Sequence, residues 1–277
     1  MPFPNCEQVL DSHPPRQMTT REGVVSYREA GTGTPVILLH GISSGAASWA
    51  PQLAGLATTD LRVIAWDAPG YGASAALGTQ APSAADYARV LGAWVDALGL
   101  ARFTLVGHSL GALMATAYAS ANPERLNHLV LLSPARGYAE ASVEEREERF
   151  RLRMDMLDRL GPEGLARERA AALLSPQAPA EAVAWVASNM RRLQPAGYCQ
   201  AARMLVDDDL GRYARDCNMP VAVICGDADH ITPTEKCRVI ASQFPAATFE
   251  VVPALGHALY IEDPAHINSL LRGHIAA

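Results

Sequence analysis

The sequence predicts an α/β protein with a mostly parallel central sheet and helices on both faces. Short runs rich in Val, Ile and Leu alternate with longer segments of helical apolar periodicity, the order of elements expected for this class. Four of the runs are almost continuously apolar, as strands buried on both faces are. One long interval in the middle of the chain has no strand signal and predicts a helical insertion.

Seven segments have the length and composition of strands. They are residues 24–27, 35–41, 62–67, 103–107, 126–133, 220–226 and 248–253. Helices are predicted between and after them, over residues 84–98, 110–121, 233–243 and 264–275. The last helix begins with Asp263-Pro264, a favourable N-cap and first-turn pair, and we expect Glu262 and Asp263 to cap it.

The interval from Arg136 to about Cys217 predicts three or four short helices between two strands. It is rich in Ala, Arg, Glu, Leu and Met and is interrupted by Pro and Gly. An insertion after a strand lies over the carboxyl edge of the sheet, where α/β proteins bind ligands. We therefore predict a core of residues 1–135 and 218–277 and a helical lid of residues 136–217. A helical layer remote from any site is the alternative.

Length, composition and charge restrict the class of function. The 277 residues suit one domain with an insertion, and 49% apolar with 19% charged residues is typical of globular proteins. A net charge of −6 without a basic run indicates that nucleic acid is not the partner. We recognise no secretory signal and no apolar run of transmembrane length, and expect a cytoplasmic protein that acts on a small molecule. Self-association is left open.

Five cysteines are scattered along the chain without a C-x-x-C pair or metal-ligand spacing. We expect these thiols to be reduced and mostly buried, and we expect no metal site.

The segment Gly107-His-Ser109-Leu-Gly111 lies between a predicted strand and a predicted helix. A sharp strand-to-helix turn forces its central residue into a strained conformation and crowds the neighbours, which glycine relieves. Such a turn would expose the Ser109 hydroxyl. The pattern is short enough to occur by chance, so the rest of the chain has to support it.

A serine hydroxyl needs a base to remove its proton, and the base needs an acid to hold its tautomer. Both residue types follow the last two predicted strands. Asp227 and Asp229 come after residues 220–226, and His257 comes after residues 248–253. From spacing alone, either aspartate could be the acid.

These segments resemble the α/β-hydrolase fold superfamily, in its lidded serine esterase and lactonase-like branch. The similarity spans about residues 24–275 without the insertion, and its motifs are His40-Gly41, Asp67-Ala-Pro-Gly-Tyr-Gly-Ala-Ser74, Gly107-His-Ser-Leu-Gly111, Gly226-Asp-Ala-Asp229 and Gly256-His257. The chain order Ser109, Asp229, His257 is that of the superfamily's triad. The resemblance selects Asp229 over Asp227 and assigns the oxyanion hole to the backbone N–H groups of Ile42 and Leu110.

The resemblance implies a serine hydrolase that needs no metal or organic cofactor. It would cleave a carboxylic ester or an (enol-)lactone of a small, largely apolar or aromatic-derived substrate through an acyl-enzyme on Ser109. Carbon–carbon hydrolases of ring-fission products are an alternative, although they carry Asn and Trp where this chain has His108 and Ala258. A ligand-binding protein with little turnover is another alternative.

Other polar residues in these motifs are expected to be structural. His40, His108 and Asp67 lie in turns, where hydrogen bonding to the loop is the ordinary role. In the insertion, Arg191, Arg192 and Arg203 either contact a substrate carboxylate or lie on a solvated helix face. Its apolar residues either wall a pocket or pack against the core, and they are Met154, Met156, Leu157, Leu160, Trp185, Met190, Leu193, Met204 and Leu205.

Overall fold

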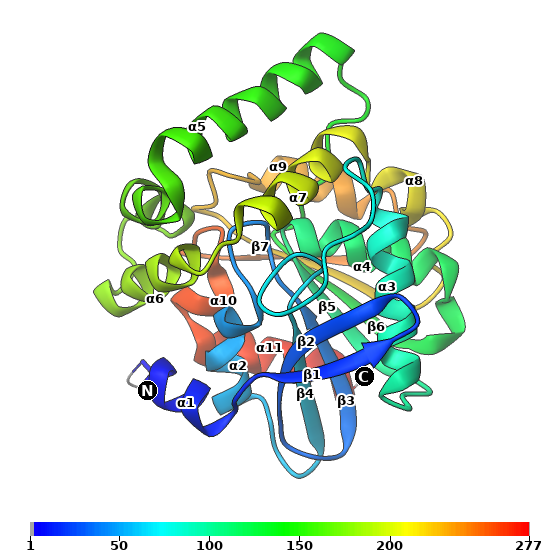
Figure 1. Cartoon of the computed structure of the whole chain (residues 1–277). Helices are drawn as coiled ribbons and strands as arrows, with labels where there is room; N and C mark the ends of the chain where they lie inside the picture. The colour runs from blue at the N-terminus through cyan, green and yellow to red at the C-terminus, as the bar shows by residue number, and fades with distance from the viewer. Residues whose placement is uncertain (1–2, 277) are drawn as a thin grey trace.

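The computed structural model describes residues 3–276, which form one eight-stranded sheet with helices on both faces (Figure 1). The strands are β1 (Arg16–Thr20), β2 (Gly23–Ala30), β3 (Thr34–Leu39), β4 (Leu61–Trp66), β5 (Phe103–His108), β6 (Leu126–Leu132), β7 (Val221–Gly226) and β8 (Ala247–Val252). Their spatial order is β1-β2-β4-β3-β5-β6-β7-β8. The β1–β2 and β2–β4 pairs are antiparallel and every pair from β4 to β8 is parallel. The predicted fold class is confirmed.

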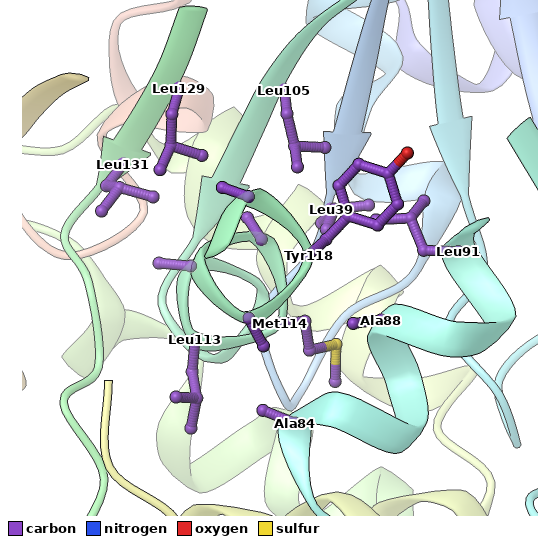
Figure 2. Close-up of a cluster of buried hydrophobic side chains, with 14 of the residues drawn as sticks. Leu39, Ala84, Ala88, Leu91, Leu105, Leu113, Met114, Tyr118, Leu129 and Leu131 are labelled. Atoms are coloured by element: carbon purple, nitrogen blue, oxygen red, sulfur yellow. The ribbon is translucent and has the colours of Figure 1, made fainter. Parts of the chain in front are cut away.

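Alternate side chains of the central strands enter two separate cores. Leu39, Leu105 and Leu131 face the helices α3 (Ala84–Ala97) and α4 (Leu110–Ala121), as Figure 2 shows. Their neighbours Leu38, Val106 and Val130 belong to the core on the opposite face. That face is covered by α1 (Cys6–Ser12), the 3-10 turn η1 (Ala46–Trp49), α2 (Ala50–Gly55), α10 (Leu259–Glu262) and α11 (Pro264–Ala276). The near-continuous apolar runs of the sequence follow from burial on both faces.

All seven predicted strands are present, but one strand and three short helices were missed. The missed strand, β1, has the sequence RQMTT and lies at the exposed edge of the sheet. It is held by its backbone pairing with β2 and has no apolar run. The missed helices are α1, α2 and α10, and each is too short to show helical periodicity.

The described residues between β6 and its parallel neighbour β7 form helices and loops and contain no strand. The helices are α5 (Val143–Arg169), η3 (Ala171–Leu173), α6 (Ala180–Arg191), α7 (Pro195–Asp207) and α8 (Gly211–Ala214), and α9 (Thr234–Ala241) follows β7. The base of this insertion is closed by a bridge between Gly137 and Asp209 and by a 2.7 Å hydrogen bond from Leu210 N to Arg136 O. Helix α5 bends where Gly161 leaves helical geometry before Pro162.

The predicted cap of the last helix is half correct. The N–H of His266 donates to Asp263 Oδ1 at 3.0 Å, so Asp263 caps α11. Glu262 does not cap it, because its buried carboxylate turns inward. It accepts hydrogen bonds from Ser175 N at 3.0 Å, from the Ser175 hydroxyl and from Gly256 N at 2.9 Å. The prediction for Glu262 was wrong because Ser175, which donates two of these hydrogen bonds to the carboxylate, is 87 residues away in sequence.

All five cysteines are free, and all except Cys199 are buried, as predicted. In the described part of the chain, the helices are too short or too polar to cross a membrane.

Removing Leu131 from the sheet is expected to destabilise the protein strongly. Its side chain is fully buried in the core of Figure 2, so Leu131→Ala should lower the free energy of unfolding by about 3 kcal/mol. Leu152 on α5 is 51% exposed, and Leu152→Ala should change it by less than about 0.5 kcal/mol. Urea unfolding of both variants measures the difference. Equal losses would contradict the central position of Leu131.

Candidate active site

Ser109 occupies the turn between β5 and α4 with φ 52° and ψ −116°. This left-handed backbone is unusual for a residue with a side chain. A Cβ on Gly107 would lie 2.6 Å from Gly111 O, and a Cβ on Gly111 would lie 2.4 Å from Leu39 O. Both glycines are needed because the turn packs so tightly. The Ser109 side chain lines a cavity of about 440 Å³.

Asp229 and His257 meet at the carboxyl ends of β7 and β8. His257 Nδ1 lies 2.9 Å from Asp229 Oδ2, and both side chains are buried. The other oxygen, Oδ1, accepts the N–H groups of Ile231 at 2.8 Å and Thr232 at 2.9 Å. Burial opposes ionisation of Asp229, but the hydrogen bonds from His257 and Thr232 outweigh it and lower the pKa to about 2. The carboxylate is therefore charged at neutral pH and holds the Nδ1 proton of His257.

Asp227 lies in the same loop but points elsewhere. Its Oδ1 accepts the N–H of Ala254 at 2.6 Å, and the residue is exposed. Ala254 has a positive φ of 60° in the turn before His257. Asp227 therefore braces this turn, and Asp229 is the carboxylate that the structure brings to His257.

Ser109 and His257 line the same cavity, and His257 is held from several sides. Its carbonyl oxygen accepts a hydrogen bond from His108 Nε2 at 3.0 Å. The next residue, Ala258, donates its N–H to Leu173 O in the insertion at 2.8 Å. Within residues 3–276 no hydrogen bond joins the Ser109 hydroxyl to His257. Catalytic hydrogen bonds are often long in a site without substrate and tighten on binding.

The backbone N–H groups of Ile42 and Leu110 have no hydrogen-bond acceptor among the described residues. Leu110 is the first residue of α4, where N–H groups have no partner inside the helix and the helix dipole favours negative charge. The peptide that carries the Ile42 N–H is held through Gly41 O, which lies 2.8 Å from His40 Nδ1 and accepts the N–H of Ser44 at 3.2 Å. The Tyr71 hydroxyl donates to Ile42 O, in the next peptide, at 2.8 Å. Ile42 lines the cavity beside Ser109.

The residues expected to be structural make the predicted hydrogen bonds. His40 Nε2 accepts the N–H of Ala68 at 3.0 Å, and burial lowers the pKa of His40. Asp67 accepts the N–H of Ala46 and the hydroxyl of Ser26, both at 2.8 Å, and thereby braces two loops. Burial, and after it the proximity of His257, lowers the pKa of His108 to about 3.

Sequence reasoning missed Thr232. Its hydroxyl lies 2.8 Å from Asp229 Oδ2, 3.1 Å from His257 Nδ1 and 3.2 Å from Ser133 O. It follows Asp229 by three residues, the spacing at which an aspartate side chain bonds the chain ahead of it, so a signal was present.

The insertion contributes fewer pocket residues than its composition suggested. Of the nine apolar residues singled out, only Leu205 is among those that line the cavity, and the others pack in the cores. The three arginines form ion pairs away from the cavity, Arg191 with Glu163, Arg192 with Glu7 and Arg203 with Asp207. The cavity wall from the insertion includes Tyr138, Arg153, Leu173, Val186 and Asn189. Among residues 3–276, no cluster of three His, Cys, Asp or Glu side chains could hold a metal ion.

Comparison with known proteins gives consistent matches over most of the chain. Residues 34–264 match the model of the alpha/beta hydrolase fold family. A protein of Klebsiella pneumoniae subsp. pneumoniae named as a carbamate hydrolase, RutD, is 28% identical over 258 residues, which cover 88% of this chain and 92% of that protein. The 2-hydroxy-6-oxononadienedioate/2-hydroxy-6-oxononatrienedioate hydrolase of Paraburkholderia phymatum is 28% identical over 256 residues, 89% of each chain.

A solved thermophilic esterase from Thermogutta terrifontis has a TM-score of 0.82 at 27% identity and covers 94% of this chain and 97% of its own. The agreement extends across the sheet and the insertion. The chain therefore belongs to the alpha/beta hydrolase fold family and is a hydrolase.

Proposed function

We propose that this hydrolase cleaves a carboxylic ester or an (enol-)lactone of a small, largely apolar or aromatic-derived substrate through an acyl-enzyme on Ser109. One observation carries the proposal: Ser109, on a strained turn, lines the same cavity as His257, and His257 is hydrogen-bonded to the ionised Asp229. The similarity to a solved esterase supports it.

In the proposed reaction, the Ser109 Oγ attacks the substrate carbonyl carbon while His257 Nε2 takes the hydroxyl proton. Asp229 stabilises the resulting imidazolium. The free N–H groups of Ile42 and Leu110 would bind the oxyanion, and such a donor contributes about 3 to 4 kcal/mol in comparable sites. The carbon–oxygen bond then breaks, His257 returns the proton to the leaving alkoxide, and a water activated by His257 releases the acid from Ser109.

We propose that residues 136–217 act as a lid over this cavity. Tyr138, Val186 and Leu205 from the insertion line the cavity together with core residues, which supports a role at the site. A helical layer remote from the site would not share these walls.

Carbon–carbon cleavage is the second candidate, because the Paraburkholderia relative is named for such a substrate. His108 and Ala258 occupy the positions where these enzymes carry Asn and Trp, which favours ester or lactone cleavage. A carbamate is a third carbonyl substrate that fits the same mechanism, in line with the Klebsiella relative's name.

Labelling with a fluorophosphonate tests for an activated serine. The wild-type protein should gain one adduct by intact mass, and Ser109→Ala should gain none and lose on the order of 10⁶ in turnover of a p-nitrophenyl ester. Ser43 also lines the cavity, and Ser43→Ala should still be labelled. An adduct that persists in Ser109→Ala would show that another residue is the nucleophile. A folded wild type that stays unlabelled would favour a ligand-binding protein.

Substitution of the two loop aspartates separates their roles. Asp229→Asn should lower turnover by about 10⁴, because the amide cannot hold the required tautomer of His257 or balance its charge. Asp227→Asn, the matched control, removes only a brace of the Ala254 turn and should cost less than about tenfold. Single-turnover kinetics on one ester compare them. The reverse order of losses would assign the acid to Asp227.

The acid limb of the pH–rate profile should report one proton. The pKa of Asp229 is about 2 and that of His108 about 3, so neither titrates between about pH 5 and 8. The rate should therefore fall with unit slope on acidification, because protonated His257 cannot accept the serine proton. The profile of kcat/KM against pH measures this. A flat profile, or a slope of two, would contradict the proposal.

A further inference from the structure

The catalytic cavity is mostly apolar but contains four charged side chains, those of Arg136, Arg153, Glu235 and Lys236. Arg136 has counter-ions, because it pairs with Asp209 at 2.9 Å and with Glu140. Within the described residues Arg153 has no carboxylate within 4.0 Å, and its hydrogen bond is a long one of 3.4 Å from Nη1 to Arg149 O. Arg153 is thus a cation in the cavity without a counter-ion.

The other arginines on the same arm of α5 are different. Arg146 pairs with Asp207, Arg149 with Glu145, Arg151 with Asp155 and Arg159 with Glu168. Those side chains lie outside the cavity and meet acidic residues on the protein surface. Arg153 alone of this set faces the cavity and alone lacks an acidic partner in the part of the chain that the structure describes.

The half-buried guanidinium of Arg153 has lost part of its hydration, and its one long hydrogen bond to Arg149 O replaces little of it. A carboxylate is the natural counter-ion, because its two oxygens match the planar fork of arginine. Lys236, the only lysine of the chain, and Glu235 also line the cavity and offset each other in charge. Arg136 has its own counter-ions, so the charge of Arg153 leaves the cavity net positive. The charge pattern of the cavity therefore favours an anionic ligand.

We propose that the substrate carries a carboxylate remote from the scissile carbonyl, and that Arg153 binds it. The substrate class is then a half-ester or a lactone acid, with an apolar body between the anionic end and the reacting bond. This inference rests on the proposed function of Ser109, and it assigns to Arg153 a role that the sequence offered as one of two alternatives for Arg191, Arg192 and Arg203.

A matched pair of esters tests the proposal. Mono-p-nitrophenyl glutarate and p-nitrophenyl pentanoate have acyl chains of equal length that end in a carboxylate and in a methyl group. The wild type should have the higher kcat/KM for the glutarate ester. Arg153→Gln should lower the ratio of the two kcat/KM values by about 10- to 100-fold, the range of a charged hydrogen bond. Arg153→Lys, which keeps the charge but not the fork, should retain part of the ratio.

Arg151→Gln is the control, because Arg151 lies two residues away, is exposed and pairs with Asp155 on the surface. It should leave the ratio unchanged. High salt should reduce the wild-type preference and have little effect on the preference of Arg153→Gln. A wild-type ratio near one, or a ratio that survives in Arg153→Gln, would overturn the role of Arg153 while leaving ester hydrolysis in place.

Binding without turnover separates this inference from the proposed function. Monomethyl glutarate should bind to Ser109→Ala by calorimetry and should bind at least tenfold more weakly to the variant that also carries Arg153→Gln. Thermal unfolding of each variant establishes that it is folded. Binding that does not depend on Arg153 would overturn the inference, whereas the absence of a fluorophosphonate adduct on wild type would overturn only the hydrolytic function.

Discussion

The left-handed conformation of Ser109 is the constraint on which the candidate site depends. It is held by three backbone hydrogen bonds, from Ser109 N to Leu132 O at 3.0 Å and from Ala112 N and Ala135 N to Ser109 O at 3.0 and 3.1 Å. Helix α4 begins directly against the end of β3, so the turn is possible only with glycine at position 111, where a Cβ would clash with the backbone. The same geometry leaves the Leu110 N–H without an acceptor among residues 3–276. The strained backbone of Ser109, the tight packing of the turn and the free N–H that we propose for the oxyanion thus have one cause.

The parallel sheet places the remaining groups around that turn. Four parallel strands have their carboxyl ends on the same side of the sheet, and they are β3, β5, β7 and β8. The site residues follow these ends in the order Ile42, Ser109, Asp229 and His257. β3 is next to β5, β7 is next to β8, and only β6 lies between the two pairs. Asp229 and His257 come from adjacent strands and meet directly. Thr232 then binds both Asp229 and Ser133, which joins the acid loop to the end of β6.

The insertion is coupled to the His257 loop as well as to the cavity. A Cβ on Gly256 would lie 2.4 Å from the Leu174 backbone, so glycine is required where the two segments touch. Glu262 accepts hydrogen bonds from both Ser175 and Gly256. A buried carboxylate that accepts hydrogen bonds from two segments holds them in one arrangement, because losing either segment would leave a buried acceptor with fewer hydrogen bonds. The part of the insertion around η3 therefore positions His257, whereas the arm of α5 carries the cavity arginine.

The sequence by itself determined the sheet, most of its helices and the residues of the candidate site. The apolar runs predicted strands that are buried on both faces, because both faces of the sheet are covered. The glycines around Ser109 predicted a tight turn, because a Cβ at either position would clash. Their order along the chain nominated Ser109, His257 and one of two aspartates, whereas the choice of Asp229 and of the Ile42 and Leu110 backbone came from the resemblance to a known family. The edge strand β1 shows no such pattern, because it pairs with β2 along one side only and places a single apolar side chain, Met18, against the core.

Tertiary structure decided what depends on partners far apart in sequence. The hydrogen bond to His257 distinguishes Asp229 from Asp227. Glu262, which was predicted to cap a helix, instead accepts a hydrogen bond from Ser175 in the interior. The choice of arginine was also a tertiary matter. Arg149 and Arg151 pair with acidic residues one turn away on α5, a spacing that the sequence shows. The partner of Arg146, Asp207, lies on α7, and only the folded chain shows that Arg153 faces the cavity. Local sequence patterns predict the burial and the backbone conformation of a residue. The pairing of charges between distant segments depends on which residues the folded chain brings together.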